Sequence, residues 1–141
     1  MNQIVFSEYV NIITTFCMFG KSELLRFIFG MHDEERRSYL DRDQWEGLII
    51  IMMKHEEVPH NKKHWNKEYD EFATTIGKKG SGEPEMFFED FQKMCTTYPM
   101  IVFAMFRLQE KMRQKHLGER FWIDQRQMFV DARARLKVRR K

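Results

Sequence analysis

The sequence lacks the features that define several large classes of protein. Its longest apolar runs, 48–53 and 100–106, are far shorter than the ~20 residues that a membrane-spanning helix needs. The N-terminal residues MNQIVFSEYV contain no basic stretch and no small-residue cleavage site, so we expect no secretory leader. The two cysteines, Cys17 and Cys95, lie in apolar surroundings, which predicts buried thiols in a reducing compartment rather than a disulfide.

Residues that break helices are also few. Three prolines and seven glycines, together with 32% charged residues, are typical of a helical protein. Apolar residues recur at three- and four-residue spacing, and no segment alternates as a strand, so we expect an all-α fold. The expected helices cover 5–18, a segment that starts with Ser22 as N-cap, 42–55, 63–76, 87–96, 99–116 with Pro99 in its first turn, and a segment from about Glu119 onward, with loops at 56–62 and 77–84.

No arrangement of side chains indicates catalysis. Neither cysteine lies in a nucleophile-like context, and no local Ser–His–Asp or Cys–His motif is present. The segment GKKGSG lacks the Lys–Ser/Thr ending of a phosphate-binding loop and is interpreted as a flexible connector. His55, His60 and His64 could form a metal cluster, but their spacing matches no recognised ligand pattern, which favours a polar linker. We therefore expect a protein that is not an enzyme and holds no cofactor.

The positive charge of the chain is concentrated at one end. Residues 124–141 contain seven basic and two acidic residues, a net charge of +5, which leaves −2 for residues 1–123 of the total +3. Such a segment is either a solvated helix face or an attachment site for an acidic surface, such as tubulin, nucleic acid or anionic lipid. The absence of aromatic residues after Val130 disfavours stacking on nucleic-acid bases. The candidate acidic-surface-binding residues are Arg133, Arg135, Lys137, Arg139, Arg140 and Lys141.

A short pattern recurs four times along the chain. Each copy has an apolar residue, a polar turn and a helix whose first buried residue is aromatic. The apolar residues are Ile4, Leu40, Met86 and Trp122, separated by 36, 46 and 36 residues. Two pairs of copies with a longer gap between them, which contains Pro59, predict two lobes.

With this pattern the chain resembles the EF-hand superfamily, in particular the two-lobed calmodulin and calcineurin-B-like group. IVFSEYVNIITTF resembles the second half of a hand, and ELLRFIFGM followed by DEERRSYLDRDQW resembles a full second hand. YPMIVFAMFRLQEKMRQKHLGERFW resembles the closing part of EF-hand proteins from protists and ciliated cells. The resemblance implies paired helix–loop–helix units, in which the apolar residue at loop position eight pairs with its twin through a short two-stranded bridge. It implies an N-terminal lobe at 1–57, a C-terminal lobe at 58–123 and a basic helix at 124–141.

The loops lack the ligands that calcium requires. An EF-hand loop supplies oxygen atoms from positions 1, 3, 5, 7 and 12 and has Gly at 6. In the second loop Asp33 and Glu35 suit the first and third positions, but Arg37 at five and Gln44 at twelve do not. The first loop begins at position five and has Glu8 at twelve, and the third has Pro84 where glycine belongs and Asp90 at twelve. The fourth loop offers no ligand set. We therefore expect no calcium, with Asp33 and Glu35 as the weak candidates, and a calcium-sensing regulator is the alternative.

The first hand begins in the middle of its loop, so we expect either a shortened chain or a partner that completes the lobe. Lobes of this kind grip an amphipathic helix through aromatic and Met side chains. We therefore expect a cytoplasmic structural or adaptor protein of the cytoskeleton. The resemblance of 98–122 to proteins of ciliated cells favours the ciliary or flagellar axoneme as its location. Tubulin is a candidate partner, and we expect no binding to nucleic acid. Binding of the basic helix to a membrane is the less favoured third hypothesis. The expected partner-groove residues are Phe16, Phe27, Trp45, Met52, Phe72, Phe91 and Met105.

Overall fold

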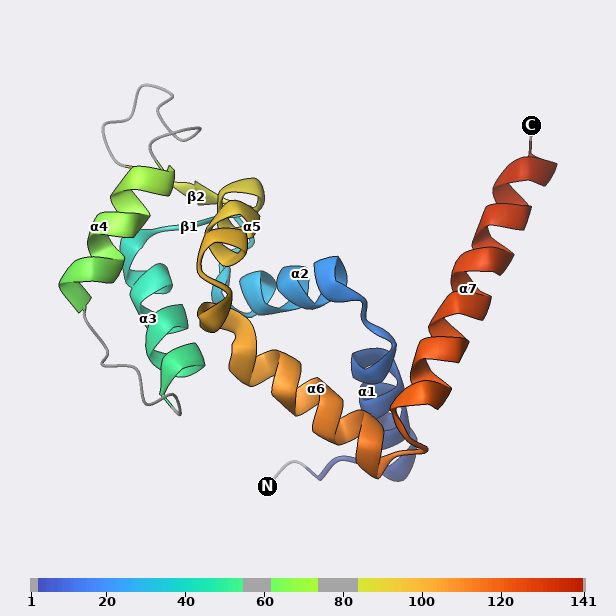
Figure 1. Cartoon of the computed structure of the whole chain (residues 1–141). Coiled ribbons are helices and arrows are strands. Elements are labelled where there is room, and N and C mark those ends of the chain that lie inside the picture. Colours follow the sequence, from blue (N-terminus) through green and yellow to red (C-terminus); the bar gives the residue numbers. More distant parts are fainter. Residues whose placement is uncertain (1–2, 55–61, 74–83, 141) are drawn as a thin grey trace. The chain divides into compact units, whose positions relative to one another are not determined.

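The computed structural model of the chain describes residues 3–54, 62–73 and 84–140 (Figure 1). These residues form seven α-helices, a short 3-10 helix and one pair of two-residue strands, which confirms that the protein is mostly helical. In chain order the elements are α1 (Phe6–Met18), α2 (Lys21–His32), β1 (Tyr39–Leu40), α3 (Arg42–Met53), α4 (Lys62–Ala73), β2 (Met86–Phe87), α5 (Phe88–Thr97), η1 (Pro99–Val102), α6 (Phe103–Lys115) and α7 (Glu119–Arg139).

Most helix boundaries agree with the predicted ones to within a few residues, but two local features differ. Helix α2 begins at Lys21, so Ser22 lies inside the first turn rather than at the N-cap. The segment 99–116 is not one continuous α-helix, because Pro99 begins the 3-10 turn η1 and α6 starts only at Phe103. The predicted loops at 56–62 and 77–84 lie almost entirely outside the described residues.

The chain divides into two compact units. Unit 1 contains residues 1–24 and 107–141, and unit 2 contains residues 25–106. This division differs from the predicted lobes at 1–57 and 58–123. The second and third copies of the repeated pattern share unit 2, whereas the first and fourth copies share unit 1.

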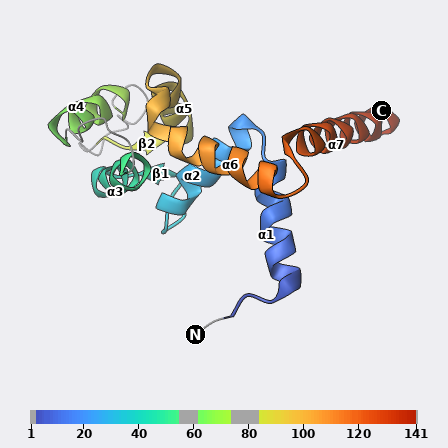
Figure 2. The ribbon, with the colours of Figure 1, turned by 60° about the horizontal axis from the view of Figure 1, so that its bottom comes forward.

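A pair of short antiparallel strands joins the two helix–loop–helix segments of unit 2, and both ribbon views show β1 beside β2 (Figures 1 and 2). Leu40 lies opposite Met86, and both side chains are fully buried. Tyr39 lies opposite Phe87, with their ring centroids 5.9 Å apart. Two-residue strands are too short to produce an alternating pattern, so the expectation of no strand is wrong at these residues. The resemblance implies a short bridge between position-eight residues, which Leu40 and Met86 both are, but within one predicted lobe rather than between the second and third copies.

Aromatic side chains connect α3, α4 and the strand pair inside unit 2. The Trp45 indole N–H donates a hydrogen bond of 3.2 Å to the carbonyl oxygen of Trp65, and its ring centroid lies 6.3 Å from that of Tyr69. The Tyr69 hydroxyl lies 2.8 Å from the carbonyl oxygen of Leu40 and 2.9 Å from that of Pro84. Burial raises the pKa of Tyr69, so its hydroxyl remains a donor that ties α4 to β1.

A small apolar cluster forms the centre of unit 1. Cys17 is fully buried in it and forms no disulfide, and burial raises the pKa of its thiol. Cys95, in unit 2, is also free and buried, so the prediction of buried free thiols is confirmed. The cluster consists of Ile13, Cys17 and Trp122, with Met18 and Met112 packed against it.

Polar side chains from α6 hold the C-terminal end of α1. The Gln109 side-chain amide donates hydrogen bonds of 2.9 Å to the carbonyl oxygens of Phe16 and Phe19. Arg113 donates from Nε to the carbonyl oxygen of Cys17 at 2.8 Å and from Nη2 to that of Phe19 at 3.1 Å. The last carbonyl groups of a helix have no partners within it and carry partial negative charge, so these donors both satisfy and neutralise them.

Arg126 on α7 completes this set of contacts. Its Nη1 donates to the carbonyl oxygen of Met18 at 3.3 Å and to Glu23 Oε1 at 2.8 Å. A Cβ atom added at Gly20 would lie only 2.1 Å from Arg126 Nη2, so the glycine makes room for the guanidinium. We call Gln109, Arg113 and Arg126 the α1 clasp, because they fix the end of α1 to α6 and α7.

Candidate functional site

The side chain at the predicted position twelve of each of the first three loops caps the helix that follows. Each is the third residue of its helix, and each accepts a hydrogen bond from the backbone N–H three residues earlier. A side chain at this position can satisfy one of the unpaired donors of the helix N-terminus. In a calcium-binding loop the side chain at position twelve is the bidentate ligand, whereas in this chain it is hydrogen-bonded to the backbone. The bonds run from Val5 N to Glu8 at 3.2 Å, from Asp41 N to Gln44 at 3.0 Å and from Phe87 N to Asp90 at 3.1 Å.

Asp33 closes the turn between α2 and β1. Its Oδ1 accepts a hydrogen bond of 2.9 Å from the backbone N–H of Arg37, and its Oδ2 accepts one of 2.9 Å from that of Ser38. Ser38 has a φ of 68°, in the left-handed region, at the position where an EF-hand loop has glycine. Both oxygens of the first predicted calcium ligand therefore bind the backbone of their own loop.

A guanidinium group gathers three side-chain oxygens of the same loop. Arg37 Nη2 donates to Asp41 Oδ2 at 2.7 Å and to Gln44 Oε1 at 3.1 Å. Arg37 Nε forms an ion pair with Glu35 Oε2 at 3.3 Å. The three oxygens belong to loop positions three, nine and twelve, and Arg37 itself is at position five. We call this set of four residues the arginine-filled loop.

These contacts shift the pKa values of both charged partners. The backbone N–H of Gln44 and the Arg37 guanidinium hold the pKa of the Asp41 carboxyl below its usual range. The hydrogen bond to Asp41 raises the pKa of Arg37 further above its already high value. Both groups are therefore charged at neutral pH, and the arginine-filled loop has its own permanent cation.

The oxygen atoms that a calcium ion would need in this loop have other hydrogen-bond partners. The ion requires six to eight oxygen ligands, whereas both oxygens of Asp33 accept bonds from the backbone and those of Asp41 and Gln44 bind Arg37 and the backbone. The positive charge of Arg37 would also repel a divalent cation. Within 3–54, 62–73 and 84–140 there is no group of three or more His, Cys, Asp or Glu residues that could hold a metal ion.

The remaining predicted loop and linker residues are only partly described. His55 and His60 lie outside the described residues, while His64 packs edge-on against Trp65 with 4.8 Å between ring centroids. The first part of the third loop, 79–83, also lies outside them. Asp90 at its end is 1% exposed, and its Oδ1 has no hydrogen-bond partner in the described structure. Burial raises the pKa of Asp90. In the fourth copy, Trp122 lies inside α7 rather than before a helix.

The predicted partner-groove residues are not gathered at one place. Trp45, Met52 and Phe91 are 0%, 3% and 0% exposed, so they are core residues of unit 2 and line no open groove in this structure. A helix face that packs on the protein's own core and a face that binds a partner have the same spacing of apolar residues. The sequence pattern therefore could not distinguish core residues from groove residues. The other four are partly exposed: Phe27, Phe72 and Met105 in unit 2, and Phe16 in unit 1.

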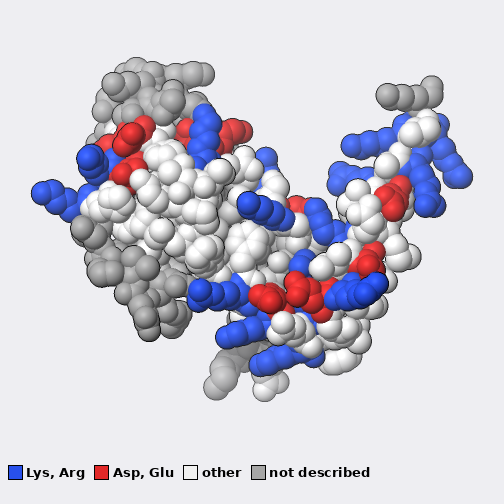
Figure 3. Space-filling view, in the orientation of Figure 1, with Lys and Arg blue, Asp and Glu red and all other residues white. Residues whose placement is uncertain are grey.

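The predicted acidic-surface-binding residues lie on α7, where basic side chains gather along its C-terminal half (Figure 3). The side chains from 127 to 140 are all exposed. Apolar residues share this segment, with Phe129 and Leu136 each 57% exposed. Lys141 lies outside the described residues. None of the other predicted residues forms an ion pair with another described residue; they are Arg133, Arg135, Lys137, Arg139 and Arg140.

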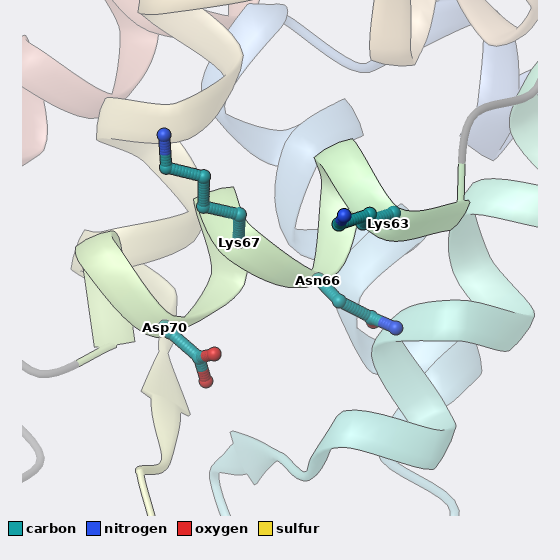
Figure 4. A pocket seen from close by; sticks show the side chains of 4 residues that line it. All are labelled: Lys63, Asn66, Lys67 and Asp70. Carbon is teal, nitrogen blue, oxygen red and sulfur yellow. The ribbon is translucent and has the colours of Figure 1, made fainter.

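A shallow depression on α4 is lined by Lys63, Asn66, Lys67 and Asp70. These are successive positions on one helix face, and their side chains point in different directions (Figure 4). Asp70 forms an ion pair with Arg42, and the Asn66 amide donates to Glu46 at 3.0 Å. Because the polar groups do not converge, we assign no binding role to this depression.

Comparison with known proteins adds no relative from which a function could be transferred. No protein-family profile, no curated protein and no solved structure matches the sequence. Among the helices that the structure describes, none is both long and apolar enough to cross a membrane. The arginine-filled loop and α7 are therefore the two features of the chain that bear on its function.

Proposed function

We propose that the chain is a non-catalytic adaptor of the EF-hand type, whose helix–loop–helix units keep their structure without calcium. The observation that carries this proposal is the position of Arg37, which pairs with Asp41 and Glu35 inside the second loop. A covalently attached cation there neutralises carboxylates that a calcium ion would otherwise neutralise. Such a loop has the same charge balance at every calcium concentration, so it suits a structural part rather than a sensor.

The capping role of position twelve supports the same proposal. In a calcium-binding hand this residue supplies the bidentate carboxylate, and recruiting it couples the exit helix to the ion. In this chain Glu8, Gln44 and Asp90 bond to the backbone of their own helix instead. The start of each exit helix is thus fixed by local hydrogen bonds.

Calorimetric titration of the full chain with CaCl2 tests this part of the proposal. We expect no heat of binding and the same thermal unfolding midpoint in calcium and in a chelator. A site with a Kd of about 10⁻⁵ M or tighter would contradict it and would favour the alternative, a calcium-sensing regulator.

We further propose that α7 attaches the adaptor to an acidic protein surface of a cytoskeletal assembly. The exposed basic residues Arg133, Arg135 and Arg139 support an electrostatic contact of this kind. The resemblance of residues 98–122 to EF-hand proteins of ciliated cells favours the axonemal microtubule as the setting. Co-sedimentation with microtubules tests it: removal of 131–141 should weaken binding, the more so at low salt. Binding that does not change on truncation would remove α7 from this role.

A further inference from the structure

Helix α7 carries a heptad pattern that continues beyond the apolar cluster of unit 1. With Trp122 as position a, the following a positions are Phe129 and Leu136, and the d positions are Gln125, Ala132 and Arg139, so the apolar stripe depends on the a positions and Ala132. Trp122 is 6% exposed, whereas Phe129 and Leu136 are each 57% exposed. Spacing that alternates between three and four residues keeps these side chains on one stripe of the helix. We call Phe129, Ala132 and Leu136, with the neighbouring Met128, the α7 seam.

Positively charged residues border the seam. Arg133 and Arg140 occupy the two e positions beside the exposed seam, and Arg135 occupies the last g position. Arg126, at the first e position, pairs with Glu23 in the α1 clasp. The two acidic residues of this segment, Asp124 and Asp131, occupy c positions on the side away from the seam, where Asp131 accepts a hydrogen bond of 2.9 Å from Gln127. Since e and g residues select the partner in a helix pair, the seam favours a partner with acidic borders.

We propose that the α7 seam binds an acidic amphipathic helix of a partner protein, with apolar residues at a and d and Glu or Asp at e and g. This inference rests on the proposed function, in which α7 is the element that contacts a protein partner, and it specifies the chemistry of that partner. The apolar stripe of α7 would align a partner helix along the seam. An acidic disordered tail without apolar residues would make no use of that stripe.

A second copy of α7 does not suit the seam. In a parallel helix pair a g residue faces the next e residue of the other helix, which would place Arg135 opposite Arg140. In an antiparallel pair e residues face e residues, so Arg133 or Arg140 would face arginine again. Like charges directly opposite each other repel, and the pattern therefore opposes self-association.

An anionic lipid surface suits α7 less well than a helix does. Helices that lie on membranes have one strongly apolar face and one strongly polar face. On α7 the apolar residues Ile123, Val130 and Val138 lie outside the seam, and they are 52%, 44% and 74% exposed. Because its apolar residues lie on several sides, α7 lacks the single broad apolar face of a helix that lies on a membrane.

Two synthetic peptides of about three heptads test the proposal by fluorescence anisotropy with the full chain. The seam peptide has Leu at every a and d position and Glu at every e and g position. The shuffled peptide has the same composition and charge, but its Leu residues no longer form a stripe. The variant F129A/L136A removes the apolar seam, and V130A/V138A is the matched control because it removes exposed apolar groups elsewhere on α7.

We expect the seam peptide to bind, and F129A/L136A to weaken binding by roughly tenfold or more while V130A/V138A changes it less than about twofold. Circular dichroism verifies that both variants remain helical. Equal binding of both peptides would overturn the proposal, since charge alone would then be recognised. Dimerisation in sedimentation velocity, or stronger binding to phosphatidylserine vesicles than to the seam peptide, would also overturn it. These outcomes are separate from the calcium titration and from microtubule co-sedimentation, so failure here leaves the proposed function standing.

Discussion

Arg37 and Asp41 form an ion pair of 2.7 Å between two residues four positions apart in the same loop. Together with Gln44, which Arg37 also contacts at 3.1 Å, they bring loop positions five, nine and twelve to one cationic group. The pair is local, so it forms whenever the turn between α2 and α3 forms. Its consequence is a loop in which Arg37 partly neutralises the carboxylates of Glu35 and Asp41.

Replacing this internal cation should create a weak site for a bound one. The double variant R37D/Q44E supplies carboxylates at positions five and twelve, beside Asp33 and Glu35 at one and three. We expect calcium binding with a Kd on the order of 10⁻⁴ to 10⁻³ M by calorimetry, in place of none for the parent chain. The control R36D/Q44E adds the same charge one residue away, at exposed Arg36, and should not bind. Equal affinity of the two variants would show that net charge alone attracts the ion.

Ser38 offers a stabilising substitution. Its φ of 68° lies in the left-handed region, where glycine is not strained and most other residues are. We expect S38G to raise the free energy of unfolding by about 0.5–1 kcal/mol in urea titrations. The control S22G places glycine inside α2, where Ser22 is exposed, and should lower it by about 0.5 kcal/mol. Destabilisation by S38G would mean that the serine side chain has a role that its backbone conformation does not reveal.

The features of the fold that could be predicted from the sequence are the local ones. Glu8, Gln44 and Asp90 fall at the third residue of a helix in each repeated pattern, and that position follows from spacing within a few residues. The pairing of Leu40 with Met86 could not be obtained in this way. The repeat spacing favours pairing of the first copy with the second and of the third with the fourth. The strands instead pair the second copy with the third, a choice that only long-range packing determines.

The α1 clasp is a second feature that could not be predicted from local sequence patterns. Gln109 and Phe16, which share a hydrogen bond, are 93 residues apart in the chain, and Arg126 and Met18 are 108 apart. No local pattern marks a polar side chain that will bond to backbone carbonyls so distant in sequence. Exposed seam residues such as Phe129 and Leu136 were visible as apolar positions, but only their exposure separates them from core residues such as Phe91.

The buried carboxyl of Asp90 should make stability depend on pH. Burial raises the pKa of Asp90 in the folded protein, so between the ordinary carboxyl pKa of about 4 and the raised value the folded state binds more protons than the unfolded state. Stability from this group therefore falls as pH rises through that window. The lowered pKa of Asp41 acts in the opposite direction and in a different range, since its contribution is lost only as pH falls below about 4.

The variant D90N cannot titrate, so its unfolding free energy should lack the fall that Asp90 causes above about pH 4. Urea titrations from about pH 4 to 7 should show a difference between D90N and the parent chain that shifts in favour of D90N as pH rises. The control D124N removes an exposed carboxyl from α7 and should leave the pH profile unchanged. A pH-independent difference for D90N would mean that Asp90 ionises in the folded protein as readily as in the unfolded one.

Loss of one arginine from the α1 clasp should loosen α1. In R113M the carbonyl oxygen of Cys17 loses its hydrogen-bond donor at 2.8 Å, and the carbonyl oxygen of Phe19 loses one of its two donors. A buried acceptor without a donor costs about 1–3 kcal/mol of stability. We expect faster hydrogen–deuterium exchange of the amides in the last turns of α1, with little change in α3 and α4, which belong to unit 2. The matched control is K111M, which makes the same kind of change at an exposed position of α6. Similar exchange in the two variants would show that apolar packing around Cys17 and Trp122, rather than the clasp, holds α1 in place.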